Sequence, residues 1–323
     1  MKQLSTDEAV NLLSRNEVVA IPTETVYGLA ANAKNDDAVR KIFAAKGRPS
    51  DNPLIVHVGS IDAVAELVTE IPTVAEKLMQ SFWPGPLTII LPSSGAISKL
   101  VTAGLDTVGL RMPNHPTALE ILQKSGLPLA APSANLSGKP SPTKAKHVVA
   151  DLSNKIEGYV DGGNCDYGLE STVIDLTVQP PVILRPGGVS KKNIEAVIGE
   201  VYLSGETSDK PKAPGMKYAH YSPAADLFLV DGNSVFLDEI VTKSVASGET
   251  VGILCATPID FGQNRNAVVY KTIGRNGNNL YAALREFDDE GCSIIFSEFF
   301  EDEAIMNRLL KASEERILSE VEN

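Results

Sequence analysis

Apolar and polar positions alternate along the chain in short periods that predict strands and amphipathic helices. In the N-terminal part, a capping box at residues 5–8 begins a predicted helix that runs to about Asn16. Further helices are expected over 36–45, 60–68 and 73–82, and strands over 18–21, 54–58, 87–91, 108–112, 129–131, 172–176 and 182–184. Because strands outnumber helices and many joints contain proline, we expect an α/β (α+β) fold with a twisted mixed sheet and flanking helices.

The C-terminal third has a more regular pattern, in which strands and helices take turns. Strands are predicted over 226–230, 251–255, 268–270 and 293–296, and helices over 234–247, 278–288 and 305–321. This alternation is typical of a small Rossmann-like α/β domain. The segment lacks a Gly-x-Gly-x-x-Gly turn, so it is not assigned a dinucleotide.

The distributions of charged residues and of prolines change at the same place in the chain as the hydropathy pattern. Residues 1–223 hold 21 basic and 23 acidic side chains (21 − 23 = −2), whereas 224–323 hold 8 and 18 (8 − 18 = −10). Nineteen of the 20 prolines precede residue 224. We therefore predict an N-terminal domain over 1–203, a linker over 204–223 and a small Rossmann-like domain over 224–323. The aromatic residues of the linker either attach it to a domain surface or make it a lid.

Composition narrows the class of protein. A net charge of −12 makes the chain a poor candidate for nonspecific binding of nucleic acid, which would need a local basic site. The opening segment lacks the apolar core of a signal peptide and no run of apolar residues could cross a membrane, so we expect a cytoplasmic protein. Three scattered cysteines and four scattered histidines predict neither a disulfide framework nor a metal site.

Cations near strand and helix ends are the first candidates for chemistry. Lys46 and Arg48 flank a glycine at a predicted helix end, where they either surround a phosphate or complement the helix dipole. Arg111 lies within an apolar strand and needs an anionic partner, which is either a structural carboxylate or a ligand. His57, in another apolar strand, is either a hydrogen-bonded core histidine or part of a site.

Loops rich in hydroxyl and amide groups follow several of the predicted strands. They cover residues 22–29, 132–138 and 169–172, and each is explained on its own by turn building. Taken together with Arg185 at a further strand end, they predict a concave site for a polyanion and a small polar molecule. No phosphate-loop, His-Glu-x-x-His or Gly-x-Ser-x-Gly motif is present in the sequence, which disfavours a P-loop NTPase, a zincin metalloprotease and a common serine hydrolase.

Six ordered segments resemble the threonylcarbamoyl-AMP synthase family, which is also called YrdC-like. They are Pro-Thr-Glu-Thr-Val-Tyr-Gly-Leu at 22–29, Lys-Gly-Arg-Pro at 46–49, Asn-Pro-Leu-Ile-Val-His at 52–57, Trp-Pro-Gly-Pro-Leu-Thr at 83–88, Pro-Ser-Ala-Asn at 132–135 and Glu-Ser-Thr-Val at 170–173. The linker and the last hundred residues resemble the longer, two-domain branch of that family.

The resemblance implies a nucleotidyltransferase that makes threonylcarbamoyl-AMP and pyrophosphate from L-threonine, bicarbonate or CO2, and ATP. A separate threonylcarbamoyl-transferase complex then modifies an adenosine beside the tRNA anticodon, so no stable direct binding of nucleic acid is expected. Mg2+ is the implied cofactor, and it is expected on the ATP phosphates because the sequence offers no dedicated carboxylate cage. An RNA-binding module and a noncatalytic nucleotide sensor remain as alternative functions.

The resemblance also implies roles for individual residues. The Lys-x-Arg and Ser-x-Asn signatures of the family fall on Lys46, Arg48, Ser133 and Asn135, which are expected to be catalytic. L-Threonine is expected to contact Thr25, His57, Arg111, Ala131 and Ser171, with Arg111 on its carboxylate. ATP is expected to contact Arg48, Asn52, Thr107, Ser133, Ser141, Arg185 and, if the linker closes as a lid, Tyr221.

Overall fold

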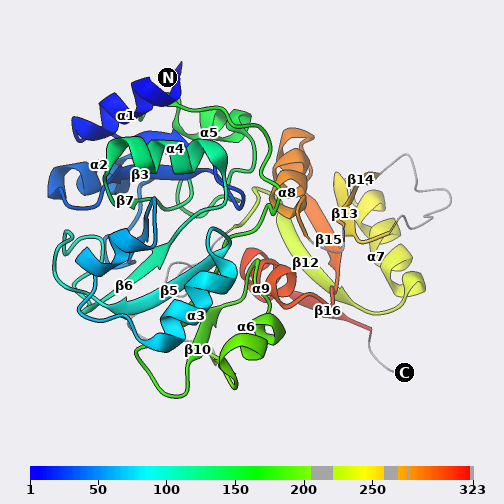
Figure 1. Ribbon diagram of the computed structural model, residues 1–323. Coiled ribbons are helices and arrows are strands. Elements are labelled where there is room, and N and C mark those ends of the chain that lie inside the picture. Colours follow the sequence, from blue (N-terminus) through cyan, green and yellow to red (C-terminus); the bar gives the residue numbers. More distant parts are fainter. Residues whose placement is uncertain (205–220, 258–267, 275–276, 321–323) are drawn as a thin grey trace. The chain divides into compact units, whose positions relative to one another are not determined.

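The computed structural model describes residues 1–204, 221–257, 268–274 and 277–320, and it divides into two compact units (Figure 1). The first unit comprises Met1–Ser137 and Ser141–Tyr218, and the second comprises Gly138–Pro140 and Ala219–Asn323. Most of the predicted linker, from 205 to 220, lies outside the described residues. The second unit thus includes a short loop segment that the sequence pattern assigned to the first domain.

The first unit is built on one mixed sheet of eleven strands. Their order is β1-β8-β2-β3-β7-β4-β6-β5-β9-β10-β11, with parallel and antiparallel neighbours. The strands are β1 (Lys2–Gln3), β2 (Val19–Ile21), β3 (Gly28–Asn32), β4 (Ile55–His57), β5 (Leu87–Pro92), β6 (Thr107–Arg111), β7 (Leu129–Ala130), β8 (Gly158–Tyr159), β9 (Thr172–Asp175), β10 (Val182–Arg185) and β11 (Tyr202–Leu203). The predicted mixed α/β architecture is confirmed.

Helices flank this sheet, and two pairs of them pack against each other. The helices are α1 (Thr6–Ser14), α2 (Asp36–Lys46), α3 (Thr73–Phe82), α4 (Pro116–Ser125), α5 (Ala145–Leu152) and α6 (Lys191–Ile198). Helix α1 begins at the predicted capping box, in which Ser5 and Glu8 bond reciprocally to each other's backbone N–H. Figure 1 shows α1 beside α4, and α3 also contacts α6. The helix predicted over 60–68 is wrong, because this segment forms only a short 3-10 helix, η1 (Asp62–Glu66).

Two buried layers hold the first unit together. On one face of the sheet, Leu13 of α1 and Ile121 of α4 pack with Leu129 of β7 in a cluster whose members are almost fully buried. The other face carries the larger cluster, to which α2 and α3 contribute Ile42 and Leu78. Truncating one of these fully buried leucines to alanine costs about 2–5 kcal/mol in proteins generally, so both layers are strongly stabilising.

The second unit has a sheet of five strands, all parallel, in the order β14-β13-β15-β12-β16. The predicted parallel α/β layer is present, but this order differs from the classic Rossmann order 3-2-1-4-5-6, because β15 lies between β12 and β13. The strands are β12 (Asp226–Asp231), β13 (Val251–Cys255), β14 (Val268–Thr272), β15 (Ile294–Glu298) and β16 (Ile317–Ser319), and the helices are α7 (Ser234–Ala246), α8 (Leu280–Asp289) and α9 (Glu303–Ala312). Within this unit, Arg285 Nε and Nη2 donate to the carbonyl of Pro140, at 3.2 and 2.5 Å.

The predicted final helix over 305–321 is wrong in its second half. Helix α9 ends at Ala312, and Glu314 and Glu315 have positive φ angles of 52° and 60° that terminate it. The chain then forms β16, which extends the sheet beside β12. Helix-forming residue types favoured continuation, but backbone pairing with an open sheet edge stabilises the strand instead.

Candidate active site

Polar side chains from separate segments meet on one face of the first sheet. The parallel register of β4 and β6 pairs His57 with Arg111, so both side chains leave the same face. Thr107 shares that face because it precedes Arg111 by four residues on β6. Next along the sheet, Thr88 of β5 hydrogen-bonds Ser171, with 2.7 Å between the two hydroxyl oxygens. Period-two geometry thus groups four predicted site residues with one that the sequence reasoning missed, Thr88.

Arg111 is the buried cation at the centre of this face, with a side-chain exposure of 4%. Its Nε donates to the Gly85 carbonyl at 3.2 Å and its Nη1 donates to Thr25 Oγ1 at 2.9 Å. Its Nη2 lies 2.6 Å from Oε1 of Glu24, a carboxylate only 3% exposed. The anionic partner that the sequence required therefore exists within the chain. The sequence reasoning missed Glu24, although it lies inside the 22–29 motif and a buried arginine called for a carboxylate.

The loop between β2 and β3 fixes the direction of its hydroxyl hydrogen bonds. Thr23 Oγ1 donates to the carbonyl of Val26 at 2.6 Å, so in its 2.9 Å contact with Thr25 it must accept. The Thr25 hydroxyl therefore donates to Thr23 and accepts from Arg111. One lone pair of Thr25 remains, which means that this residue can serve a ligand only as an acceptor.

His57 is a buried, neutral imidazole. Burial lowers its pKa to about 3, and the positive charge of Arg111 acts in the same direction. Within the described parts of the chain, its Nδ1 has no hydrogen-bond partner. At neutral pH the ring can therefore accept or donate one hydrogen bond to a ligand without adding charge.

The Lys-x-Arg and Ser-x-Asn signatures come together at the end of α2. Lys46 is buried and its Nζ donates to the carbonyl of Ser133 at 2.5 Å and to the carbonyl and side-chain oxygen of Asn135 at 2.7 and 3.3 Å. These three acceptors match the three N–H donors of an ammonium group. Lys46 therefore fixes the Ser133–Asn135 loop and places a positive charge directly beneath it.

Arg48 follows immediately, beyond the left-handed Gly47 that ends α2 with a φ of +61°. Its Nη2 donates to the Pro53 carbonyl at 3.2 Å, which holds the half-buried guanidinium against the segment that enters β4. The neighbouring Asn52 is 1% exposed, and its side-chain amide makes no hydrogen bond to any described residue.

A third group forms where β9 and β10 meet. Arg185 donates from Nε and Nη2 to the Ser171 carbonyl at 3.2 and 2.9 Å. Ser141 donates to the carboxylate of Glu170 at 2.6 Å, so this acidic residue holds the loop before Ser171. A Cβ on Gly187 would lie 2.4 Å from the Glu170 carbonyl oxygen, so only glycine permits this close approach of backbones.

Two other predicted site residues have different surroundings. Ala131 is buried in the cluster beneath α1 and α4, and its N–H donates to the Ile55 carbonyl beside His57. Tyr221 belongs to the second unit, where its ring stacks on Tyr281 with centroids 5.2 Å apart. The expected contact of Tyr221 with ATP stays a prediction, and most of the linker that would close as a lid lies outside the described residues.

Several buried polar atoms on and beside this face lack a hydrogen bond of normal geometry to any described residue. In the described structure, side-chain atoms of Glu24, Asn52, His57 and Arg111 are inaccessible to solvent and form no hydrogen bond of normal geometry. Such atoms are uncommon in folded proteins, because each loses its hydration without compensation. Their presence on neighbouring elements indicates a site that a polar ligand completes.

The comparisons with known proteins identify the family of each part of the chain. The Sua5/YciO/YrdC family, described as telomere recombination, matches residues 11–187. The family described as the C-terminal domain of threonylcarbamoyl-AMP synthase matches residues 189–314.

Relatives over nearly the full chain carry the same name. Threonylcarbamoyl-AMP synthase of Bacillus subtilis is 50% identical over 96% of this chain and 93% of its own length, and that of Pyrococcus abyssi is 47% identical over 96% and 94%. The crystal structure of P. abyssi Sua5 complexed with L-threonine superimposes with a TM-score of 0.91 at 45% identity, covering 99% of this chain and 98% of that one. This chain therefore belongs to the threonylcarbamoyl-AMP synthase family and is an enzyme that makes threonylcarbamoyl-AMP.

Proposed function

We propose that the polar face of β4, β6 and their neighbouring loops binds L-threonine beside ATP and joins them through a carboxyl group derived from bicarbonate or CO2. The observation that carries this proposal is that buried side-chain atoms of Asn52 and His57 form no hydrogen bond with any described residue, close to the buried Arg111–Glu24 ion pair. Asn52, His57 and Arg111 are residues expected to hold the two substrates. A complex of L-threonine with the similar P. abyssi protein supports the amino acid as substrate.

The threonine subsite is centred on Arg111. Its guanidinium supplies donors for the substrate carboxylate, and its orientation is fixed by Gly85 and Thr25. Thr25 offers its remaining lone pair, and the neutral His57 offers a hydrogen bond without electrostatic repulsion of the arginine. Ala131 and Ser171 are proposed to complete the walls of this subsite.

The ATP subsite is proposed to lie between the Lys46 loop and the Arg185 cluster. Its cations balance the triphosphate charge, and Lys46 and Arg185 are held in place by backbone carbonyls. Preorganised positive charges of this kind stabilise the charge that develops during phosphoryl transfer. The proposed contacts are Arg48, Asn52, Thr107, Ser133, Ser141, Arg185 and Tyr221, with Asn135 completing the pocket.

The chemistry requires alignment of two anions. The deprotonated amine of threonine forms a bond to the carbon of CO2, and an oxygen of the resulting carbamate attacks the α-phosphorus of ATP as pyrophosphate leaves. Positioning of this kind is worth about 7–11 kcal/mol of activation free energy in favourable cases. No covalent bond to the protein is needed, so the cations and hydroxyls act by binding and orientation.

Mg2+ is proposed to enter with ATP. Among the described residues, no group of three or more His, Cys, Asp or Glu side chains could hold a metal ion, which fits an ion carried on the triphosphate and not in a protein cage. When bound, Mg2+ would supply positive charge to the phosphate oxygens.

The product is proposed to pass to a separate threonylcarbamoyl-transferase complex in the cytoplasm. In the described part of the chain, no helix combines the length and apolar character needed to cross a membrane. The net charge of −12 accords with a protein that does not itself hold tRNA.

One assay tests the proposed function directly. Purified protein is incubated with ATP, Mg2+, radiolabelled bicarbonate and each amino acid in turn, and labelled adenylate and pyrophosphate are measured. Threonine alone should give the labelled adenylate with stoichiometric pyrophosphate. Binding of ATP without pyrophosphate release would support a nucleotide sensor, and tight, strongly salt-dependent binding of short RNA would support an RNA-binding module.

A further inference from the structure

We propose that Glu24 is the receptor for the α-ammonium group of the amino-acid substrate, so that Glu24 and Arg111 together recognise a zwitterion. The inference rests on the proposed function of this face and assigns a specificity-determining residue to it. Glu24 lies in the loop between β2 and β3, and its side chain is 3% exposed.

The first argument comes from the hydrogen-bonding capacity of the Glu24 carboxylate. Its two oxygens can accept about four hydrogen bonds. Oε1 lies 2.6 Å from Arg111 Nη2, yet within the described residues neither oxygen forms a hydrogen bond of normal geometry. Arg111 compensates the charge of this buried carboxylate but leaves most of its lone pairs unused, and these favour a ligand with several N–H donors. An ammonium group brings three such donors.

The remaining N–H donors of the Arg111 guanidinium also indicate an amino-acid ligand. Nε donates to Gly85 and Nη1 to Thr25, while Nη2 is in ionic contact with Glu24. Of its five N–H groups, these contacts leave donors on both terminal nitrogens for an incoming carboxylate. Carboxylate-binding and ammonium-binding groups therefore lie 2.6 Å apart, which suits two charges borne on a single α-carbon.

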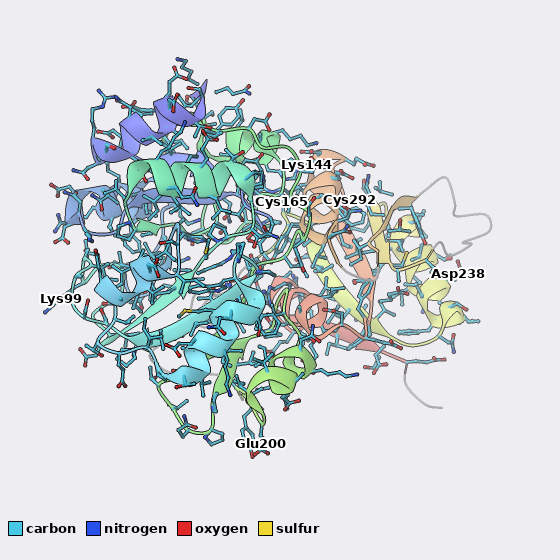
Figure 2. The ribbon with its side chains drawn as sticks, viewed as in Figure 1. Lys99, Lys144, Cys165, Glu200, Asp238 and Cys292 are labelled. Atoms are coloured by element: carbon cyan, nitrogen blue, oxygen red, sulfur yellow. The ribbon has the colours of Figure 1, made fainter. Side chains whose placement is uncertain are left out.

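Charge balance supports the pairing. Burial raises the pKa of the Cys165 thiol (labelled in Figure 2) to about 12 and lowers the pKa of the His115 imidazole, so both of these neighbours are neutral. Asp166 is a nearby negative charge that acts on both groups. Glu24 and Arg111 form a buried pair without net charge. A zwitterion adds no net charge to that pair, whereas a hydroxy acid adds one negative charge, which is costly in a site of low dielectric constant.

Thr25 fits the same arrangement. Its hydroxyl proton is directed to Thr23, so the lone pair that remains can accept a hydrogen bond from the substrate ammonium and cannot donate to the carboxylate. Glu24 and Thr25 would then share the recognition of one positively charged group. If Glu24 were only a structural counterion of Arg111, its charge would matter equally for every carboxylate ligand.

Isothermal titration calorimetry with two ligands separates these roles. Binding of L-threonine and of the 2,3-dihydroxybutanoate with matching stereochemistry is measured for the wild-type protein and for Glu24→Gln, which keeps an oxygen beside Arg111 but removes the charge. Loss of a buried charge partner costs about 30-fold or more in affinity. We expect threonine binding to weaken by at least that factor, with the dihydroxy acid unchanged or bound more tightly.

A second variant provides a test in case Glu24→Gln does not fold. Glu24→Asp retains the charge but withdraws it by one methylene, and it should weaken threonine binding at least tenfold while changing binding of the dihydroxy acid less than threefold. Urea unfolding checks that each variant is folded. Equal weakening of both ligands in a folded variant would overturn the role of Glu24 while leaving the proposed function intact. A wild-type protein that binds no threonine would overturn both.

Discussion

The polar face of the first sheet and the carboxyl edge of the second sheet differ in whether their described polar groups are paired within the chain. In the first unit, Asn52 and His57 are buried with side-chain atoms that no described residue satisfies. At the carboxyl edge of the second sheet, Asn233 caps α7 and bonds the Glu320 carboxylate, and Glu298 accepts from the N–H of Ala256. The carboxyl edge of a parallel sheet is a common ligand site, but here its polar groups satisfy one another.

This contrast shows why the catalytic chemistry is assigned to the mixed sheet. Unsatisfied buried groups lower the stability of the protein without ligand. A ligand that supplies the missing hydrogen-bond partners offsets this loss of free energy. Polar groups that already bond to one another, as at the carboxyl edge of the second sheet, gain no comparable free energy from a polar ligand. The acidic second unit, with its net charge of −10 over residues 224–323, also repels a triphosphate.

The largest effect is expected from removing the buried cation. Arg111→Ala should abolish product formation and lower the free energy of unfolding by about 3–5 kcal/mol, because Glu24 is left buried and uncompensated. The control is Lys243→Ala in the second unit, whose ion pair with Glu239 on α7 is solvent-exposed, so its removal should cost less than about 1 kcal/mol. Urea unfolding measures both. Equal costs would show that burial does not distinguish the two pairs.

The next effect concerns Arg48, which is half-buried and so should be removable without unfolding. Arg48→Ala should reduce product formation by about 10²–10³-fold, as for other preorganised donors to a developing charge. Arg40→Ala is the matched control on α2, the helix that precedes Arg48, since Arg40 is exposed and pairs with Asp37. Pyrophosphate release follows both variants, and near wild-type turnover of Arg48→Ala would remove this residue from the site.

A smaller effect should appear in the pH dependence of stability. The folded pKa of His57 is about 3 whereas an unfolded histidine titrates near 6.5, so acid protonates the unfolded state first. Stability contributed by the neutral ring is complete above pH 6.5 and declines as the pH falls toward 3. Between pH 7 and 5 the loss should be about 2 kcal/mol. His57→Gln should remove this component, so urea midpoints of the wild type and variant should converge at pH 5. Parallel curves would contradict it.

The smallest expected effect on stability concerns the helix cap at the carboxyl edge of the second sheet. Asn233→Ala removes the cap of α7, in which Asn233 Oδ1 accepts from the N–H groups of Val235 and Phe236, and should cost about 1 kcal/mol. Product formation should be unchanged. Ser5→Ala, which removes the cap of α1 in the first unit, is the comparison and should behave similarly. A loss of turnover in Asn233→Ala alone would assign this edge a part in catalysis.

Local patterns predicted most elements because their signals lie within a few residues. The capping box at Ser5 and the periodicity over 73–82 predicted α1 and α3, and the six motif segments were sufficient to recognise the family. The end of α9 was predicted wrongly because pairing of β16 with β12 joins residues about 90 positions apart. No local propensity records that pairing.

The sequence by itself determined the mixed α/β class and the change in charge and proline content near residue 223. It also determined which cations are candidates for the site. Tertiary structure alone decided that Arg111 pairs with Glu24, that Lys46 binds the Ser133–Asn135 loop and that His57 is neutral. Each of these depends on burial and on contacts between distant segments. The hydrogen-bond partners of a side chain and the shift of its pKa both depend on those surroundings, which exist only in the folded chain.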